Sequence, residues 1–277
     1  MKMLPDLILM NNTSLTTFLA MLCVVVSASS GCNSAPPVLT EEIAPGIYRI
    51  KVSRSNVYLL AGENLVLIDT GMKGEGKAIL QAIESIGRKP GEVSHILITH
   101  AHIDHTGSLA FLKQATGAKV VASAKEIDYV SGLKKTWTMG REGFGGKVFK
   151  IMLWFMETFP FKYEPASVDF PCKDGDVLEC FGKVNVIETP GHSIGSVSYY
   201  LPERKIIFVG DALSGVPEPK LPPKAGCSDY QQARRSVKII AALNFSTCCF
   251  GHGNHINDRA DTVIRKLILA SGSPSVR

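Results

Sequence analysis

The feature that most constrains this chain is a succession of short strands followed by helices, which occurs twice along the sequence. In the first half, β-branched runs are separated by Ser, Gly and Asn, which is the pattern of antiparallel strands joined by turns. Strands are predicted at 46–52, 56–62, 65–71, 95–100, 119–123, 184–190, 196–202, 205–211 and 248–253, and helices at 76–87, 107–116, 123–131, 230–243 and 258–270. This order predicts an α+β fold in which two sheets pack face to face with helices on both outer faces.

The composition of the 277 residues indicates a globular protein with a large core. Hydrophobic residues make up 45% and charged residues 20% of the chain, which excludes a disordered protein. The net charge of +5 comes from scattered basic residues, whereas a nucleic-acid footprint normally needs a basic stripe. We expect no nucleic-acid partner and a single domain over 41–277, with an apolar insertion near 132–165.

Residues 1–31 have the order of an export signal. Lys2 precedes the apolar stretch 15–26, which is shorter than the about 20 residues of a membrane span and is followed by small residues. The sequence before Cys32 is similar to the lipobox of bacterial lipoproteins, although Ser29 stands where a leucine is usual. We expect an exported protein that is periplasmic, extracellular or anchored to a membrane through Cys32, with 32–40 as a linker. A plain signal peptide and a misassigned start are the alternatives.

Three of the seven histidines fall within six residues, directly after the predicted strand at 95–100. His100 ends that strand, and His102 can point to the same side because strand side chains alternate. Asp104 and His105 then lie on the turn into a helix, so four donors can converge from one loop. Imidazole and carboxylate together suit zinc, with iron or manganese less favoured.

Three further residues of ligand type follow apolar runs in the second half of the chain. His192, Asp211 and His252 each have a neighbouring glycine, which lets the backbone come close to a bound group. Because all three follow the histidine-rich segment 100–105 along the sequence, they are expected to share one site with it. His95 is expected to be a core histidine, and His255 a loop histidine without a role.

Five segments in order resemble the metallo-β-lactamase-fold hydrolases, in the branch of glyoxalase II and the lactonases. They are LIDTG at 67–71, THAHIDHTG at 99–107, TPGHSIGS at 189–196, FVGDAL at 208–213 and GHG at 251–253. The resemblance implies an αββα sandwich with two metal ions. It implies that one ion is bound by His100, His102 and His192, that the second is bound by Asp104, His105 and His252, and that Asp211 bridges the two. Asp69 is expected to orient a ligand region from behind.

The implied chemistry is an attack by metal-bound hydroxide, with no serine or cysteine nucleophile. Two dications about 3.5–4 Å apart lower the pKa of a shared water toward about 7 and polarise the substrate carbonyl. We expect two Zn²⁺ per chain, with Fe or Mn as alternatives, and Asp104 and Asp211 as catalytic residues. The expected function is an exported metal-dependent hydrolase that acts on a small ester, thioester or lactone. The alternatives are an enzyme like the mononuclear-iron persulfide dioxygenases and a non-catalytic surface metal-binding protein.

Sequence differences from known branches of the family exclude some classes of substrate. Asp211 stands where β-lactamases of this fold usually have Cys or Ser, which argues against an antibiotic-resistance role. Ser214 stands near the position at which several lactonases have a tyrosine. The chain ends soon after His252, and glyoxalase II has a helical glutathione-binding domain there, so glutathione specificity is not expected.

Two other features leave alternatives open. The segment 147–161 reads as a helix that is apolar nearly all round, which suits a helix packed into the core, a lid over the site or a membrane contact. Cys172 and Cys180 flank a Lys-Asp-Gly-Asp turn, and a hairpin there brings them together as a disulfide in an oxidising compartment. Two free thiols are the alternative.

Overall fold

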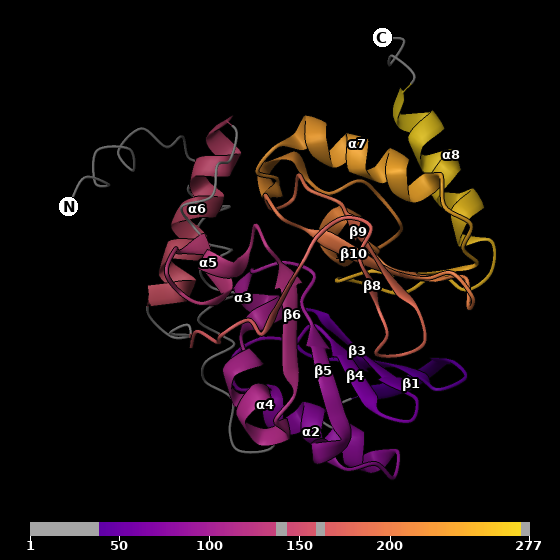
Figure 1. The fold of residues 1–277 in the computed structure, drawn as a ribbon. Helices are drawn as coiled ribbons and strands as arrows, with labels where there is room; N and C mark the ends of the chain where they lie inside the picture. The colour runs from indigo at the N-terminus through magenta and orange to yellow at the C-terminus, as the bar shows by residue number, and fades with distance from the viewer. Residues whose placement is uncertain (1–38, 137–142, 159–163, 273–277) are drawn as a thin grey trace.

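The computed structural model describes residues 39–136, 143–158 and 164–272, which form two sheets packed face to face (Figure 1). The larger sheet has seven strands in the order of the sequence: β1 (Leu39–Ala44), β2 (Ile47–Lys51), β3 (Asn56–Ala61), β4 (Leu65–Ile68), β5 (Val93–Leu97), β6 (Lys119–Ser123) and β7 (Phe170–Cys172). The smaller sheet has the order β12-β11-β10-β9-β8, with β8 (Val177–Leu178), β9 (Val184–Glu188), β10 (Val197–Leu201), β11 (Ile206–Phe208) and β12 (Thr247–Cys249).

Both sheets are mixed. Strands β1 to β4 form an antiparallel meander, and β4 to β7 are parallel to one another. In the smaller sheet only β11 and β12 are parallel. The parallel strands of the larger sheet end on the same edge, so the loops that follow them meet there.

The alternation of side chains along the strands builds the layers of the core. In β10, Tyr199 and Leu201 pack between the two sheets, whereas Tyr200 points to the outer face. In β11, Phe208 lies between the sheets and Ile207 on the outer face. This period of two is expected for strands that are covered on both sides.

Helices cover both outer faces and complete the αββα sandwich that the sequence predicts (Figure 1). On the larger sheet, α2 (Gly76–Ser85) and α4 (Leu109–Thr116) bury Ile79 and Leu112 in one cluster with strand residues. On the smaller sheet, α7 (Tyr230–Ala241) and α8 (Ala260–Gly272) bury Val237 and Ile264 in another. The short helices α3 (Ile103–Thr106) and α5 (Ile127–Val130) follow β5 and β6, respectively.

The apolar segment forms α6 (Gly143–Thr158), which begins a few residues earlier than predicted; residues 159–161 of the predicted helix lie outside the described residues. Its residues Met152 and Phe155 pack against Met72 and Ile103, so α6 is seated on the loops that follow β4 and β5. Within the described ranges, no helix is long and apolar enough to cross a membrane. The leader, Cys32 and most of the predicted linker lie outside the described residues.

The structure does not contain the hairpin that would pair Cys172 with Cys180. Cys172 ends β7, which pairs with β6 in the larger sheet, whereas β8, just before Cys180, pairs with β9 in the smaller sheet. The turn between β7 and β8 therefore connects two sheets rather than two neighbouring strands. Both cysteines are free thiols.

Candidate metal centre

The seven predicted ligand residues come together where the loops of the two sheets meet. His100 and His102 lie in the loop after β5, and Asp104 and His105 lie on α3. The second half contributes the other three: His192 follows β9, Asp211 lies in the single turn Gly210–Ala212 after β11, and His252 follows β12. Each ligand thus follows a buried strand, which fixes the start of its loop.

One group consists of three imidazoles, those of His100, His102 and His192, and all three are buried. Their ring centroids lie 4.7–4.8 Å apart, with the ring planes nearly perpendicular. His192 Nε2 lies 2.9 Å from His102 Nδ1. Three imidazole nitrogens gathered around one point form a site for a cation.

A second group consists of Asp104, His105 and His252. Asp104 Oδ2 lies 3.3 Å from His252 Nε2 and 3.9 Å from His105 Nε2. The two imidazole Nε2 atoms are 3.3 Å apart. This set of two nitrogens and one carboxylate is also typical of zinc.

The Asp211 carboxylate lies between the two groups. Oδ2 is 3.4 Å from His192 Nε2 in the first group and 3.3 Å from His252 Nε2 in the second. Oδ1 lies 3.5 Å from His105 Nε2. One side chain can therefore contact ions in both groups, which is the position that the bridging role requires.

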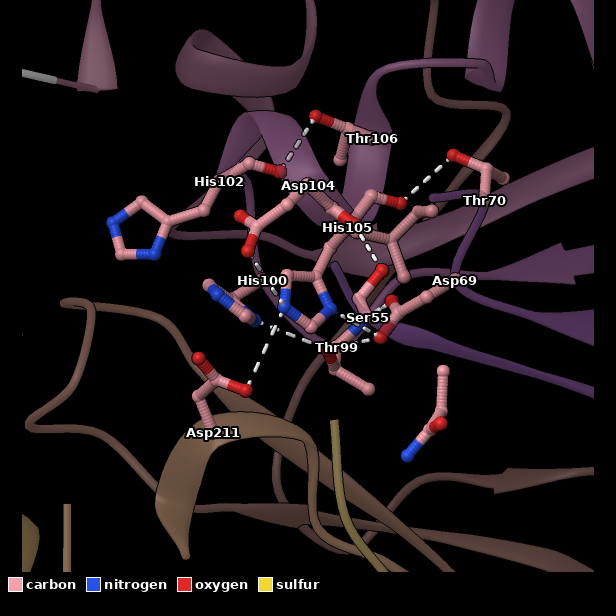
Figure 2. A network of polar contacts seen from close by, with 12 residues as sticks. Ser55, Asp69, Thr70, Thr99, His100, His102, Asp104, His105, Thr106 and Asp211 are labelled. Atoms are coloured by element: carbon pink, nitrogen blue, oxygen red, sulfur yellow. Dashed lines mark hydrogen bonds and ion pairs between the residues drawn. The ribbon is translucent and has the colours of Figure 1, made fainter. Parts of the chain in front are cut away.

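Asp69 holds the ligand His105 directly and the ligand His100 through Thr99 (Figure 2). It is buried directly after β4 with a φ of 62°, a backbone conformation that non-glycine residues seldom adopt without a constraint. Oδ1 accepts a hydrogen bond from Thr99 N (2.9 Å), and Oδ2 accepts one from Thr99 Oγ1 (2.8 Å). Oδ2 also accepts a bond from His105 Nδ1 (2.8 Å). The contacts are those expected of a residue that orients the ligand loop.

These contacts determine which imidazole nitrogens face the site. The Thr99 hydroxyl gives its hydrogen to Asp69, so at 3.1 Å it accepts a bond from His100 Nδ1. His105 Nδ1 donates to Asp69, and His252 Nδ1 donates to the carbonyl of Arg54 at 2.6 Å. In all three rings Nε2 keeps its lone pair for a metal ion. Among the described residues, the buried His100 Nε2 has no hydrogen-bond partner, so the donor set fits a metal ion.

The electrostatics of the cluster favour ionised carboxylates. Burial raises the pKa of Asp211, but the neighbouring His252 and His105 outweigh burial and hold it well below its usual range. Burial lowers the pKa of His105, yet Asp211 and the other nearby carboxylates raise it to about 9. By the same balance, Asp211 and Asp104 raise the pKa of His252 to about 12. The pKa of His100 is well below its usual value, mainly because of burial. Without metal ions, protons on the imidazoles therefore balance the carboxylates.

A buried glutamate that the sequence analysis missed joins two ligand loops. Glu126 is 1% exposed, and its Oε2 accepts a hydrogen bond from Ala101 N at 3.0 Å. Its Oε1 accepts bonds from Ser193 Oγ and Gly195 N, both at 2.8 Å. Ala101 lies between two ligand histidines, and Ser193 follows His192. Nothing in the local sequence separates Glu126 from a solvent-exposed glutamate, because its partners are distant along the chain.

The two remaining histidines lie outside both ligand groups. His95, expected in the core, is half-buried on β5, and its Nδ1 lies 3.0 Å from Ser94 Oγ. His255 lies in the loop after β12, where its Nε2 contacts the side-chain amide of Asn257 at 3.0 Å. Neither histidine is part of a candidate metal site in the described ranges.

A cavity of about 360 Å³ opens over the cluster, and its size is at the lower end of the range for small-molecule pockets. His102, Asp104, His192, Asp211 and His252 contribute to its lining. One wall is apolar and comes from Phe149, Met152 and Leu153 of α6. The α6 helix therefore forms a side of the pocket, and a function as a lid stays a prediction.

Comparisons with known proteins agree with this fold. The family model of the metallo-beta-lactamase superfamily matches residues 50–252. The probable metallo-hydrolase YflN of Bacillus subtilis is 24% identical over 76% of this chain and 85% of that protein. A hydroxyacylglutathione hydrolase of Rhizobium meliloti is 31% identical over 64% of this chain, which spans only 54% of that relative. A metallo-beta-lactamase family protein from Thermus thermophilus superposes with a TM-score of 0.63 at 25% identity, over 83% of this chain and 80% of that one.

Proposed function

The chain belongs to the metallo-beta-lactamase superfamily and is a metallo-hydrolase of that fold, and we propose that it cleaves a small ester, thioester or lactone. The observation that carries this proposal is the convergence of two ligand groups, with Asp211 between them, on the floor of one small cavity. The similarity to a hydroxyacylglutathione hydrolase, a thioesterase by name, supports the choice of substrate class.

We propose two zinc ions as the cofactor. One would be held by His100, His102 and His192, and the other by Asp104, His105 and His252, with Asp211 touching both. When bound, two dications supply Lewis acidity and lower the pKa of a coordinated water.

The residues of the chain orient and enclose this chemistry. Asp69 and the Arg54 carbonyl hold ligand imidazoles by their Nδ1–H groups, so that Nε2 points inward. Asp104 lines the cavity, and the neighbouring His105 and His252 hold its pKa below the usual range, so its carboxylate would face a bound dication in the ionised form. Phe149, Met152 and Leu153 of α6 form an apolar wall of the cavity, and the low polarity of this wall strengthens electrostatic interactions beside it.

Metal analysis combined with a substrate panel tests the proposal. We expect two zinc ions per chain and turnover of at least one member of a panel of esters, thioesters and lactones. His102→Ala and Asp211→Ala are expected to lower both metal content and turnover. His95→Ala is the matched control, because it removes an imidazole from β5 outside the clusters. Full activity in either ligand variant would refute the proposal, and one iron with oxygen uptake would favour the dioxygenase alternative.

We further propose that residues 1–31 direct export and that Cys32 anchors the mature protein to a membrane. The support is the order of Lys2, an apolar stretch and small residues before the cysteine. Intact mass and fractionation of the protein from its host test both parts. Cys32→Ser is expected to move the protein to the soluble fraction, and an uncleaved residue 1 in all fractions would contradict export.

A further inference from the structure

The turn between β2 and β3 is attached to two members of the second ligand group, Asp104 and His252. The Arg54 carbonyl accepts the hydrogen bond of His252 Nδ1, and Ser55 Oγ donates to the carbonyl of Asp104 at 2.5 Å. At the start of β3, Asn56 N donates to the carbonyl of Gly251 at 2.7 Å. The backbone of Arg54 is therefore held at the edge of the candidate metal centre.

The side chain of Arg54 has no polar partner among the residues that the structure describes. It is half-buried and lines the cavity, yet no described residue accepts a hydrogen bond from its guanidinium or pairs with it. By contrast, the guanidinium of Arg49 on the adjacent β2 bonds to Glu41, to the Gly253 carbonyl and to Asn254. A cation fixed by its backbone and left without an acceptor can bind an anion that enters the cavity.

The two carboxylates that line the cavity, Asp104 and Asp211, do not pair with the Arg54 guanidinium. Asp104 and Asp211 lie 3.3 Å from His252 Nε2 and belong to the ligand set. With these groups used by metal ions, the guanidinium is left for an anion on the substrate. A guanidinium binds a carboxylate through two parallel hydrogen bonds, which an ammonium cannot do.

The apolar side chains of α6 indicate a second property of the substrate, besides its negative charge. Phe149, Met152 and Leu153 line the cavity together with Leu213 and Val216 of the loop after Asp211. A substrate that fits this cavity has an apolar part against these side chains and a charged group that reaches Arg54.

We propose that Arg54 is the binding residue for a carboxylate of the substrate. On the basis of the function proposed above, the substrate is an ester, thioester or lactone with one apolar part and one carboxylate.

Paired probes test this assignment. The first probe is the p-nitrophenyl monoester of a linear dicarboxylic acid, and the second has the free carboxylate replaced by a neutral carboxamide. We expect kcat/KM to favour the carboxylate probe, and Arg54→Gln to lower kcat/KM for this probe about tenfold or more while the neutral probe changes little. Arg54→Lys is expected to have a kcat/KM for the carboxylate probe between those of Arg54→Gln and the native protein, because lysine has the positive charge but cannot form the two parallel hydrogen bonds of a guanidinium. Equal effects of Arg54→Gln on both probes would overturn the proposal.

A matched control and a binding measurement separate this proposal from the one on which it rests. Arg235→Gln removes the same charge from an exposed position on α7 that does not line the cavity, and is expected to leave the probe ratio unchanged. Calorimetry with the non-hydrolysable amide analogue of the carboxylate probe measures binding without turnover. Binding that depends on Arg54 without turnover of any substrate supports the anion site and refutes the hydrolase. Turnover with a probe ratio and analogue affinity that do not depend on Arg54 refutes the anion site alone.

Discussion

Glu126→Ala removes the buried carboxylate that joins the loop of His100 and His102 to the loop of His192. In the native protein this carboxylate accepts hydrogen bonds from the backbone amides of Ala101 and Gly195 and from the Ser193 hydroxyl. After the substitution, the amides of Ala101 and Gly195 lose their acceptor. The Ser193 hydroxyl keeps an alternative partner in Ser196 Oγ, 2.7 Å away.

The magnitude follows from the two amides. A buried donor that loses its partner costs about 1–3 kcal/mol, so two cost about 2–6 kcal/mol of the free energy of unfolding. This is a large part of the about 5–15 kcal/mol that a protein of this kind has. Glu126→Gln keeps the side-chain volume and one of the two acceptor oxygens. The NH₂ group of glutamine takes the place of the other oxygen and faces a hydrogen-bond donor. We therefore expect a loss of about 1–3 kcal/mol for glutamine, smaller than that for alanine.

The effect on metal binding is expected to be confined to one group. The hydrogen bonds from Ala101 N, Ser193 Oγ and Gly195 N connect Glu126 to the loops that carry His100, His102 and His192, the three imidazoles of the first group. Urea unfolding and competition with a chelator measure stability and the two metal affinities. Glu84→Ala, an exposed glutamate on α2, is the control. A loss below about 1 kcal/mol with both metal affinities unchanged would refute this reasoning.

Three further predictions concern the same region and the core. Gly251→Ala is expected to lower metal content, because a Cβ there would collide with Asp211 Oδ1, whereas Gly91→Ala meets open space and is the control. The metal-free protein is expected to lose unfolding free energy as pH rises from about 6.5 through about 9. The reason is that the pKa of His105 is raised to about 9 in the folded protein. Protonated His105 therefore stabilises the folded protein fully below its pKa in the unfolded chain, and this stabilisation is lost as pH rises through its pKa in the folded protein. A urea midpoint that rises over this range would contradict the prediction. Burial raises the pKa of Cys172 to about 12, so iodoacetamide at pH 8 is expected to label it only in denatured protein, as peptide mass spectrometry can show.

The layers of the fold could be predicted because the strands and helices carry their periods in the local sequence. The alternation in β10 and the apolar face of α2 are visible without a structure, and both elements form where they were expected. The hairpin at Cys172 and Cys180 was wrong because a turn signal specifies a change of direction and not the partner of the next strand. Here β7 already pairs with β6.

The candidate site divides in the same way. The seven candidate ligands could be picked from the sequence, because each is a histidine or aspartate that follows an apolar run. The structure brings all seven together. That they bind metal stays a prediction. Glu126 and Arg54 could not be found, because an ordinary charged side chain gains its role only from loops that lie distant along the chain.

The two halves of the chain share each of the candidate metal sites. His100 and His102 follow a strand of the larger sheet and meet His192 of the smaller sheet, and Asp104 and His105 meet His252 in the same way. A bound ion would therefore cross-link the sandwich, and at a thousandfold excess over its dissociation constant it would add about 4 kcal/mol to the stability. The supply of metal where the protein folds would then set the yield of folded molecules as well as their activity.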